Sequence, residues 1–384
     1  MASASTSHPY GNQAKLSSGE VYWRDHYIWL KQSGYALKPR FNPDWVPSWT
    51  GKNIDPNDCE DSKPLGMFGL GWAAAAECKR TGKYVVLKPI NIQKSRGEVR
   101  VLNMLSKEPL KSQRENHTVP ILAVLCPPDD ELNTRILVMP LLRRFNDPPF
   151  ETMGEALHFI DSFLTGLDFM HRSNIAHGSI CTFNLMMDAT DMYPDGFSAT
   201  WHGMKKDWSG PVHNKYTRTE KPPKYYLIDF SRSTHFAQGN THLECSSVPD
   251  TTVPELFQFP YKYPIDPFAV DVYCAGNMLR QYFLDGFPSP MTHEGTGYHG
   301  FDFLRPLLSD MIQVDPRKRP KMPEVVFRFK EIEKGLDRSF LRERCRKVVN
   351  HPCEEESKLD ALRYHLHKMA YGVRGLSPIP SDNT

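Results

Sequence analysis

The sequence lacks three features that mark common protein classes: paired cysteines, an excess of one charge, and a long hydrophobic run. Its eight cysteines are scattered, with no Cys-x-x-Cys pair and no cluster at zinc-ligand spacing, which predicts free thiols and no zinc. The 47 Lys and Arg nearly balance 45 Asp and Glu, so no strongly basic surface for nucleic acid is expected. Without a signal-peptide core or membrane-length apolar run, we expect an intracellular protein, cytoplasmic or nuclear, with no membrane segment.

At 384 residues the chain is long enough for two lobes with buried cores, and its 32 prolines divide it into segments. Apolar, β-branched runs at 83–90 and 135–142 predict buried strands, and the spacing in 98–105 predicts a helix between them. A Thr-x-x-Glu capping signal at Thr152 begins a long buried helix through residue 172. Helix-rich sequence follows from 271 to 347. The order indicates an α+β protein with a small strand-rich part and a larger helical part.

Polar residues suited to phosphate chemistry follow the long helix. His177, Gly178 and Ser179 come first, Asn184 lies five positions after Ser179, and Asp229 ends the apolar run YYLID some forty residues later. Asn and Asp oxygens are ligands that Mg²⁺ prefers, usually together with substrate phosphates. This order predicts a metal and phosphate site formed by Asn184 and Asp229.

This spacing resembles the eukaryotic protein kinase pattern, a catalytic loop His-Arg-Asp-x-x-x-x-Asn followed by Asp-Phe-Gly. The segments PRFNPDWVPSW, NHTVPIL, LVMPLL, NLMMD, YPDGF and YYLIDF resemble the kinase-like proteins expanded in mushroom-forming basidiomycete fungi. The resemblance implies a bilobal protein kinase-like fold, with a small β-rich N-lobe at 61–142 and a larger helical C-lobe at 143–347. A long insert near 189–224 interrupts the C-lobe. Residues 1–60 are expected to form a partly disordered extension with an aromatic and proline-rich strap, and 348–384 a helix and disordered tail.

The resemblance implies an ATP and Mg²⁺ site and assigns residues to it. Lys88 stands at the phosphate-binding lysine, Glu98 at its partner in the next helix, Met139 at the gatekeeper position and Leu141 in the hinge. Gly66 and Gly71 stand at the first and third glycines of the nucleotide loop, and Phe68 replaces the middle one. In the C-lobe, Glu255 is the expected partner of Arg319, and Asp271 is expected to anchor the catalytic-loop backbone.

Three departures from the pattern affect positions that take part in phosphate transfer or recognition. Ser179 replaces the catalytic aspartate and cannot act as a carboxylate base, an assistance that is worth about 10²- to 10⁴-fold in rate. Cys181 replaces the lysine that meets the transferring phosphate, and Gly178 replaces the arginine that clasps an activation-loop phosphate. We therefore expect a pseudokinase that binds ATP and Mg²⁺ and regulates or scaffolds a protein partner.

Three alternatives stay open on the sequence alone. The first is a slow but active Ser/Thr kinase acting on a protein substrate, with Asp188, Asp207 or another insert residue substituting for the base. The second is a kinase-fold interaction protein without nucleotide, favoured by the bulky Phe68 in the glycine loop. The third, a small-molecule phosphotransferase of the His-Gly-Asp type, is disfavoured by Ser179 and by Asp271. The last amphipathic helix, with Leu359, Leu362, Leu366 and Met369, is expected to pack on the larger lobe or to bind a partner.

Overall fold

A computed structural model describes residues 13–63, 72–128, 133–236, 248–257, 265–287, 297–348 and 358–381, without the side chains of 358–360. The chain is an α+β protein, which confirms the class predicted from the sequence. It divides into two compact units. The smaller unit comprises residues 1–95, 120–141 and 195–213, and the larger unit comprises 96–119, 142–194 and 214–384.

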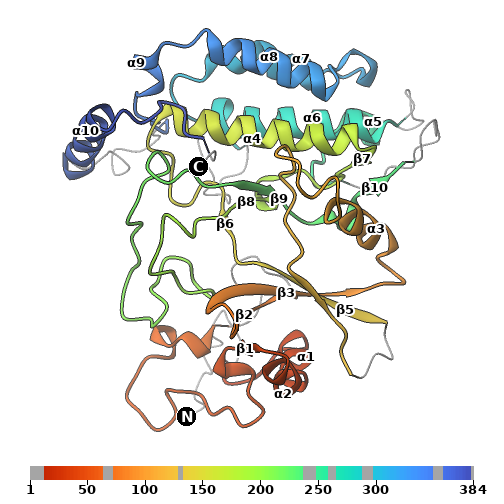
Figure 1. Ribbon diagram of the computed structural model, residues 1–384, viewed down its shortest axis with the longest axis vertical. Coiled ribbons are helices and arrows are strands. Elements are labelled where there is room, and N and C mark those ends of the chain that lie inside the picture. The colour runs from red at the N-terminus through yellow and green to blue at the C-terminus, as the bar shows by residue number, and fades with distance from the viewer. Residues whose placement is uncertain are drawn as a thin grey trace, which may run out of the picture. The chain divides into compact units, whose positions relative to one another are not determined.

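An antiparallel five-stranded sheet with strand order β1-β2-β3-β5-β4 forms the centre of the smaller unit (Figure 1). Its strands are β1 (Tyr35–Leu37), β2 (Ala74–Cys78), β3 (Lys83–Asn91), β4 (Ala123–Leu125) and β5 (Thr134–Pro140). The two runs predicted as strands are β3 and β5, and they pair from Val85↔Pro140 to Asn91↔Thr134. Their β-branched side chains suit a half-buried pleated surface, so both strand predictions are confirmed.

Two short helices, α1 (Ser18–Asp25) and α2 (Tyr27–Gln32), pack against this sheet. Ser17 and Glu20 close a capping box that begins α1, although composition predicts disorder up to about residue 20. Three 3₁₀ turns follow, at Pro39–Phe41, Pro56–Asp58 and Glu60–Ser62. The apolar side chains of helices and sheet share one core: Trp23, Leu30, Leu37, Phe41, Ala74, Ala76, Val85, Leu87, Ile136 and Val138.

A buried ion pair fixes the amino-terminal segment of the smaller unit. Arg40 Nε lies 2.6 Å from Glu20 Oε1, and each side chain is only 1% exposed. The same guanidinium donates hydrogen bonds to the backbone carbonyls of Gln13, Lys15 and Asp61. Because a buried guanidinium needs partners for all its donors, this network holds the segment in one conformation.

The long insert after Asp188 divides between the two units. Residues 195–213 belong to the smaller unit, while 189–194 and 214–224 belong to the larger. Within the smaller unit, the Lys63 ammonium lies 5.6 Å from the Trp201 ring and 5.9 Å from the Trp208 ring. Thr200 Oγ1 also donates to Glu60 Oε1 at 3.0 Å. Residues 195–213 therefore pack on the amino-terminal extension.

Helices dominate the larger unit. They are α3 (Arg96–Leu105), α4 (Met153–Arg172), α5 (Pro254–Phe257), α6 (Pro267–Leu279), α7 (Arg305–Met311), α8 (Met322–Lys334), α9 (Arg338–Leu341) and α10 (Lys358–Val373). A π-helical turn continues α6 over Arg280–Asp285. The buried helix predicted from Thr152 is α4, and α8 lies along it (Figure 1). Thr152 Oγ1 accepts the Glu155 N–H as the capping signal requires.

Two small sheets complete the larger unit. One has the order β6-β8-β9, from β6 (Arg143–Arg144), β8 (Leu185–Met187) and β9 (Tyr225–Leu227). The other pairs β7 (Ile175–Ala176) with β10 (Thr234–His235). Short 3₁₀ turns lie at Thr182–Asn184, Phe230–Arg232, Asp302–Leu304 and Pro316–Lys318. β7, β8 and β9 thus flank the predicted phosphate-site residues.

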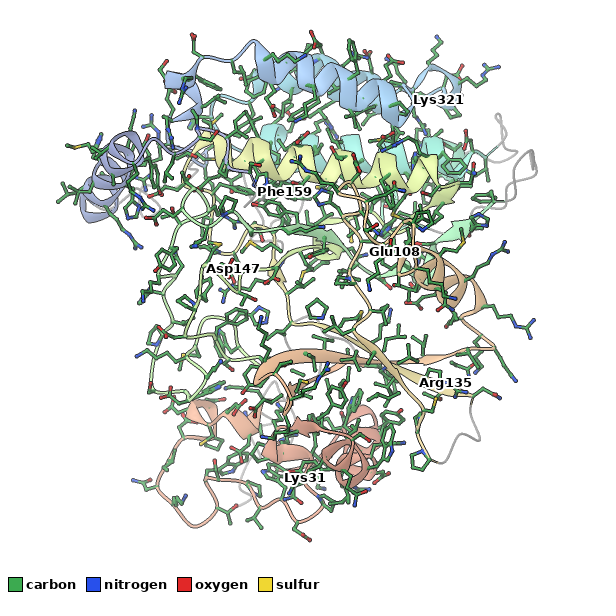
Figure 2. The ribbon with its side chains drawn as sticks, viewed as in Figure 1. Lys31, Glu108, Arg135, Asp147, Phe159 and Lys321 are labelled. Carbon is green, nitrogen blue, oxygen red and sulfur yellow. The ribbon has the colours of Figure 1, made fainter. Side chains whose placement is uncertain are left out.

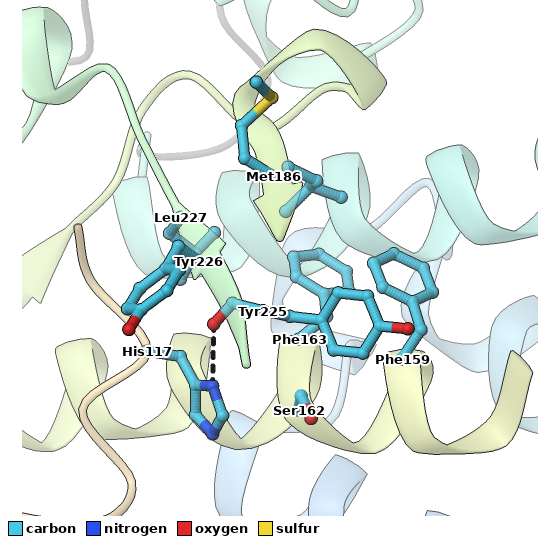
Figure 3. Close-up of a pocket in the computed structure, with 9 residues that line it drawn as sticks. His117, Phe159, Ser162, Phe163, Met186, Tyr225, Tyr226 and Leu227 are labelled. Atoms are coloured by element: carbon cyan, nitrogen blue, oxygen red, sulfur yellow. Dashed lines mark hydrogen bonds between the residues drawn. The ribbon is translucent and has the colours of Figure 1, made fainter. Parts of the chain in front are cut away.

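Aromatic side chains fill the space between α4 and β9. Phe159 projects from α4 (Figure 2), and its ring meets that of Tyr225 at 5.2 Å. The cavity between these elements measures about 10 Å³, near the smallest volume that holds one water, so it is no ligand site (Figure 3). His117 Nδ1 bonds the Tyr225 carbonyl at 2.9 Å, and a Cβ on Gly166 would come within 2.6 Å of His117 Cβ. Gly166 therefore permits the close approach of His117 to α4.

The carboxy-terminal residues after α10 fold back onto the larger unit as far as residue 381, although composition predicts a disordered tail. Arg342 donates a hydrogen bond to the Leu376 carbonyl. The Pro378 carbonyl lies against Gly154 at the start of α4, where a Cβ would have no room. Packing on α4 thus outweighs the local polarity of this tail.

The buried ion pair between Arg319 and Glu255 provides a test of this packing. Both side chains are 0% exposed, and the two nitrogen–oxygen distances are 2.6 and 2.7 Å. Arg319→Met leaves the Glu255 carboxylate buried without its cation, so we expect a loss of about 3–5 kcal/mol in the free energy of unfolding. Urea denaturation followed by circular dichroism measures this loss.

Arg317 is the matched control, because it lies two residues away and is paired with Asp315 at the surface. Arg317→Ala should change the free energy of unfolding by less than about 1 kcal/mol. Equal losses in both variants would contradict a structural role for the buried pair.

Candidate functional site

The predicted phosphate-site loop begins where α4 ends. Asn174 takes a positive φ of 57° after the helix, and β7 then pairs with β10. After β7 come His177, Gly178 and Ser179. The backbone N–H groups of His177 and Gly178 meet Asp271 in the amino-terminal half of α6. The loop continues through a 3₁₀ turn to Asn184, where β8 starts.

One carboxylate holds the backbone of this loop. Asp271, on α6 and 1% exposed, accepts the N–H of His177 at 2.6 Å and that of Gly178 at 2.9 Å. Its Oδ2 atom also lies 3.1 Å from His171 Nε2 in the last turn of α4. Charge-assisted bonds to two successive backbone donors fix both position and direction of the loop. The resemblance implied this role for Asp271, and the hydrogen bonds bear it out.

His177 braces the loop from inside. The side chain is 0% exposed, its Nδ1 atom accepts the Ser179 N–H at 3.1 Å, and its ring lies 5.4 Å from that of Phe230. Burial lowers the pKa of this imidazole, against the opposing effect of the Asp271 and Asp229 carboxylates. His177 is therefore a neutral packing group at physiological pH.

Gly178 is required by the local geometry. Its φ is +71°, and a Cβ at this position would come within 2.7 Å of the Arg232 carbonyl oxygen. Ser233 holds that neighbouring segment through a 2.7 Å bond from Oγ to the His177 carbonyl. A side chain at position 178 would be strained and would displace the turn after Asp229. The close packing of the loop against Arg232 and Ser233 therefore requires glycine at position 178, where the kinase pattern has arginine.

Ser179 and Asn184 form a pair. The Asn184 amide Nδ2 donates to the Ser179 carbonyl at 2.7 Å and lies 3.0 Å from Ser179 Oγ. Ser179 is 3% exposed, whereas Asn184 is half-buried. With its nitrogen engaged by the loop, the Asn184 side chain presents Oδ1 as its ligating atom. A neutral hydroxyl thus stands at the position where the kinase-like pattern expects a carboxylate.

Strand register brings Asp229 beside Asn184. Leu185 of β8 pairs with Leu227 of β9, and the Ile228 N–H donates to the Asn184 carbonyl at 3.0 Å. Asp229 is the next residue, in the left-handed conformation with φ 63° and ψ 76°. Such a conformation is uncommon outside glycine and often marks functional sites. The register places Ile228 opposite Asn184, so Asp229 follows directly after the residue that is bonded to Asn184, while their joint role as ligands stays a prediction.

Glu98 lies in the same unit as Asp229. It occupies the first turn of α3, is 4% exposed, and α3 contacts the 3₁₀ turn that follows Asp229. The buried Phe230 belongs to that turn. A buried carboxylate requires polar or charged partners.

The remaining predicted residues belong to the smaller unit. Lys88 is half-buried on β3 opposite Leu137, and Met139 on β5 pairs with Val86. Leu141 follows β5 directly and is half-buried. Gly66 and Gly71, with Phe68 between them, lie outside the described residues. Each unit therefore carries part of the predicted nucleotide-binding set.

The oxygen donors of the larger unit suit a magnesium ion that is shared with phosphates. Asn184 Oδ1 and the Asp229 carboxylate supply hard oxygen ligands, and Mg²⁺ is usually bound by one or two such groups plus waters and substrate phosphates. Among the described residues no group of three His, Cys, Asp or Glu side chains gathers to hold a metal. The residues fit a nucleotide-dependent magnesium and do not form an independent metal centre.

Two residues of this arrangement had no signal in the sequence. His171 contacts Asp271 from a helix position that the apolar spacing identifies only as helical, and Ser233 bonds His177 across 56 positions of sequence. Both contacts depend on the packing of α4, α6 and the turn after Asp229. Local patterns do not specify such long-range hydrogen bonds.

Comparison with known proteins adds no relative. No protein-family model matches the sequence, and a search of curated proteins finds no match. No helix in the described ranges is long and apolar enough to cross a membrane.

The Asp271 carboxylate can be tested by substitution with its own amide. Asp271→Asn places an NH₂ group where an oxygen accepted a backbone N–H, leaving a buried donor unsatisfied. We expect the free energy of unfolding to fall by about 2–3 kcal/mol, measured by urea denaturation. Asp302→Asn, at a side chain that is 81% exposed, is the control and should leave stability nearly unchanged. Equal stability of the two variants would show that the loop does not depend on Asp271.

Proposed function

We propose that the chain is a protein kinase-like pseudokinase of the bilobal fold, similar to the kinase-like proteins of mushroom-forming fungi. It binds ATP with Mg²⁺, transfers phosphate poorly, and regulates or scaffolds a protein partner inside the cell. The observation that carries the proposal is the loop from His177 to Asn184, held by Asp271 and set beside Asp229. Fold alone does not determine function, so the argument depends on these side chains.

The larger unit supports the metal half of this proposal. Asn184 and Asp229 stand at the ends of paired strands, half-buried and with oxygen atoms suited to Mg²⁺. Mg²⁺ would neutralise phosphate charge, and the protein would orient it through these two side chains. The buried Glu255–Arg319 pair supports the kinase-like resemblance of the same unit, because the resemblance implies this pairing.

The smaller unit supplies the proposed nucleotide contacts. Lys88 is the proposed cation for the phosphates. Its proposed partner, Glu98 of α3, belongs to the larger unit. Met139 and Leu141 lie at and after the end of β5, where an adenine ring would meet backbone and apolar side chains. The other two proposed contacts, Gly66 and Gly71, lie outside the described residues.

Loss of catalysis follows from Ser179 and Cys181. A serine hydroxyl does not ionise at cellular pH, and a neutral thiol replaces a cation that would meet the transferring phosphate. General-base assistance alone is worth about 10²- to 10⁴-fold, and electrostatic stabilisation is commonly the larger contribution. The two losses need not add, because groups that act as a unit are non-additive.

The described geometry weighs against the two named substitutes for the base. Asp188 Oδ1 accepts the backbone N–H and the hydroxyl of Thr190, at 2.9 and 2.5 Å, and so closes a local turn. Asp207 accepts the Ser209 N–H at 3.0 Å in an exposed turn of the insert, and hydrogen bonds from the Ser209 side chain and backbone lower the pKa of its carboxyl. Both carboxylates are used as turn residues, so the active-kinase alternative is the weaker proposal.

A thermal-shift titration tests nucleotide binding. ATP with Mg²⁺ should raise the melting temperature as its concentration rises, because binding at 100 times Kd stabilises the folded state by about 2.7 kcal/mol. Asp229→Asn should abolish the metal-dependent part of the shift, while Asp302→Asn should retain it. If millimolar ATP with Mg²⁺ or Mn²⁺ gives no shift, the nucleotide-free interaction protein becomes the better conclusion.

A phosphotransfer assay tests the role of Ser179. Ser179→Asp restores a carboxylate within reach of the Asn184 amide, and we expect transfer to a Ser/Thr peptide mixture to rise about 10²-fold. Ser179→Ala is the matched control and should leave the low natural rate unchanged, because the hydroxyl is no base. A strong loss in Ser179→Ala, or no gain in an ATP-binding Ser179→Asp protein, would contradict the assignment.

A further inference from the structure

The carboxy-terminal helix α10 packs on the larger unit through its polar and aromatic face. Tyr364 and Tyr371, seven residues apart, are 7% and 1% exposed. The Tyr371 hydroxyl donates to Glu151 Oε2 at 2.6 Å and lies 2.8 Å from Thr217 Oγ1. His367 Nδ1 also lies 2.6 Å from Glu151 Oε1. These contacts hold one face of α10 firmly against the fold.

The opposite face of α10 is an exposed apolar stripe. Leu362, Leu366, Met369 and Val373 are 56%, 58%, 69% and 89% exposed. Their spacing of four, three and four residues matches the a and d positions of a heptad repeat. We call these four residues the α10 stripe. The helix does pack on the larger unit as expected, but the leucine face expected to make that contact points away from it.

The α10 stripe has the width of a helix-pairing seam. A strict a/d pattern covers a narrower arc than the face of a helix that lies in a membrane or packs on a globular core. Ala370 and Gly372, which flank the stripe, are small and exposed and so allow a second backbone to approach closely. A single helix lying along α10 would fit this surface.

Basic side chains surround the α10 stripe. Arg363 and Lys368 are exposed on α10 itself. His365 is also exposed beside the stripe. A second copy of α10 would bring the same positive charges together, whereas an acidic helix would be attracted. Charge complementarity therefore favours an acidic partner helix over a second copy of α10.

We propose that the α10 stripe docks an acidic amphipathic helix of another protein. Leucine-type side chains of that helix pack between Leu366 and Met369, and a glutamate or aspartate meets Arg363, which stands at an e position beside the stripe. This is the helix-in-groove mode of recognition, with anchors at heptad spacing. The proposal does not depend on nucleotide binding, because α10 lies away from Asn184 and Asp229 in sequence and contacts.

Binding of a designed peptide tests the proposal. The probe is a peptide of about four heptads, with Leu at a and d and Glu at e and g, whose own glutamates oppose self-pairing. The full chain should bind it, as measured by fluorescence anisotropy, and should bind the charge-inverted Lys peptide at least about tenfold more weakly. Equal binding of both peptides, or binding of neither, would overturn the proposal.

Surface variants locate the contact. Leu366→Gln with Met369→Gln should abolish peptide binding without loss of stability, because both side chains are more than half exposed. Phe327→Gln on α8, also at an exposed apolar side chain, is the matched control and should bind normally. The pair Arg363→Glu and Lys368→Glu should reverse the preference toward the Lys peptide.

Two further measurements examine other occupants of the stripe. Light scattering of the protein alone should show a monomer at micromolar concentration, and a dimer that Leu366→Gln dissociates would replace the proposal with self-association. Sedimentation with phosphatidylserine vesicles should leave the protein in solution. Co-sedimentation that is lost in the Leu366 and Met369 variant would overturn the proposal in favour of a membrane surface.

Discussion

The hydrogen bonds from two successive backbone N–H groups to the Asp271 carboxylate set the geometry on which the candidate site depends. A buried carboxylate needs donors, and a loop with unpaired N–H groups needs an acceptor, so each satisfies the other. With the loop fixed at His177 and Gly178, the chain reaches Asn184 in the position to begin β8. The register of β8 and β9 then carries Asp229 to its side. The hydrogen bonds to Asp271 thus organise a site whose other residues come from distant segments of the chain.

The departures from the kinase pattern have different physical origins. Gly178 is demanded by the packing of the Arg232 carbonyl against the loop, so this position belongs to the fold. Ser179 is different, because its hydroxyl accepts the same Asn184 amide that a carboxylate would accept. The loop therefore keeps its shape while losing a charge.

Local patterns in the sequence were sufficient for the elements that carry strong periodicity, such as β3, β5 and α4 with its Thr152 cap. The joint role of Asn184 and Asp229 stays a prediction from the motif spacing, and the β8–β9 register brings only their backbone segments together. The capping box of Ser17 and Glu20 was present in the sequence but was outweighed by polar composition. The outward direction of the α10 leucines was not predictable, because it depends on tyrosine and histidine contacts with residues some two hundred positions away.

The packing of residues 195–213 on the amino-terminal extension has a consequence for evolution. Lys63 lies near two tryptophans of the insert, and Glu60 accepts a hydrogen bond from Thr200, so each segment covers part of the other. If either segment were lost alone, apolar surface or a buried cation would be left exposed or unpaired. The amino-terminal extension and residues 195–213 should therefore evolve together. They form one structural element that is encoded by two separate segments of the gene.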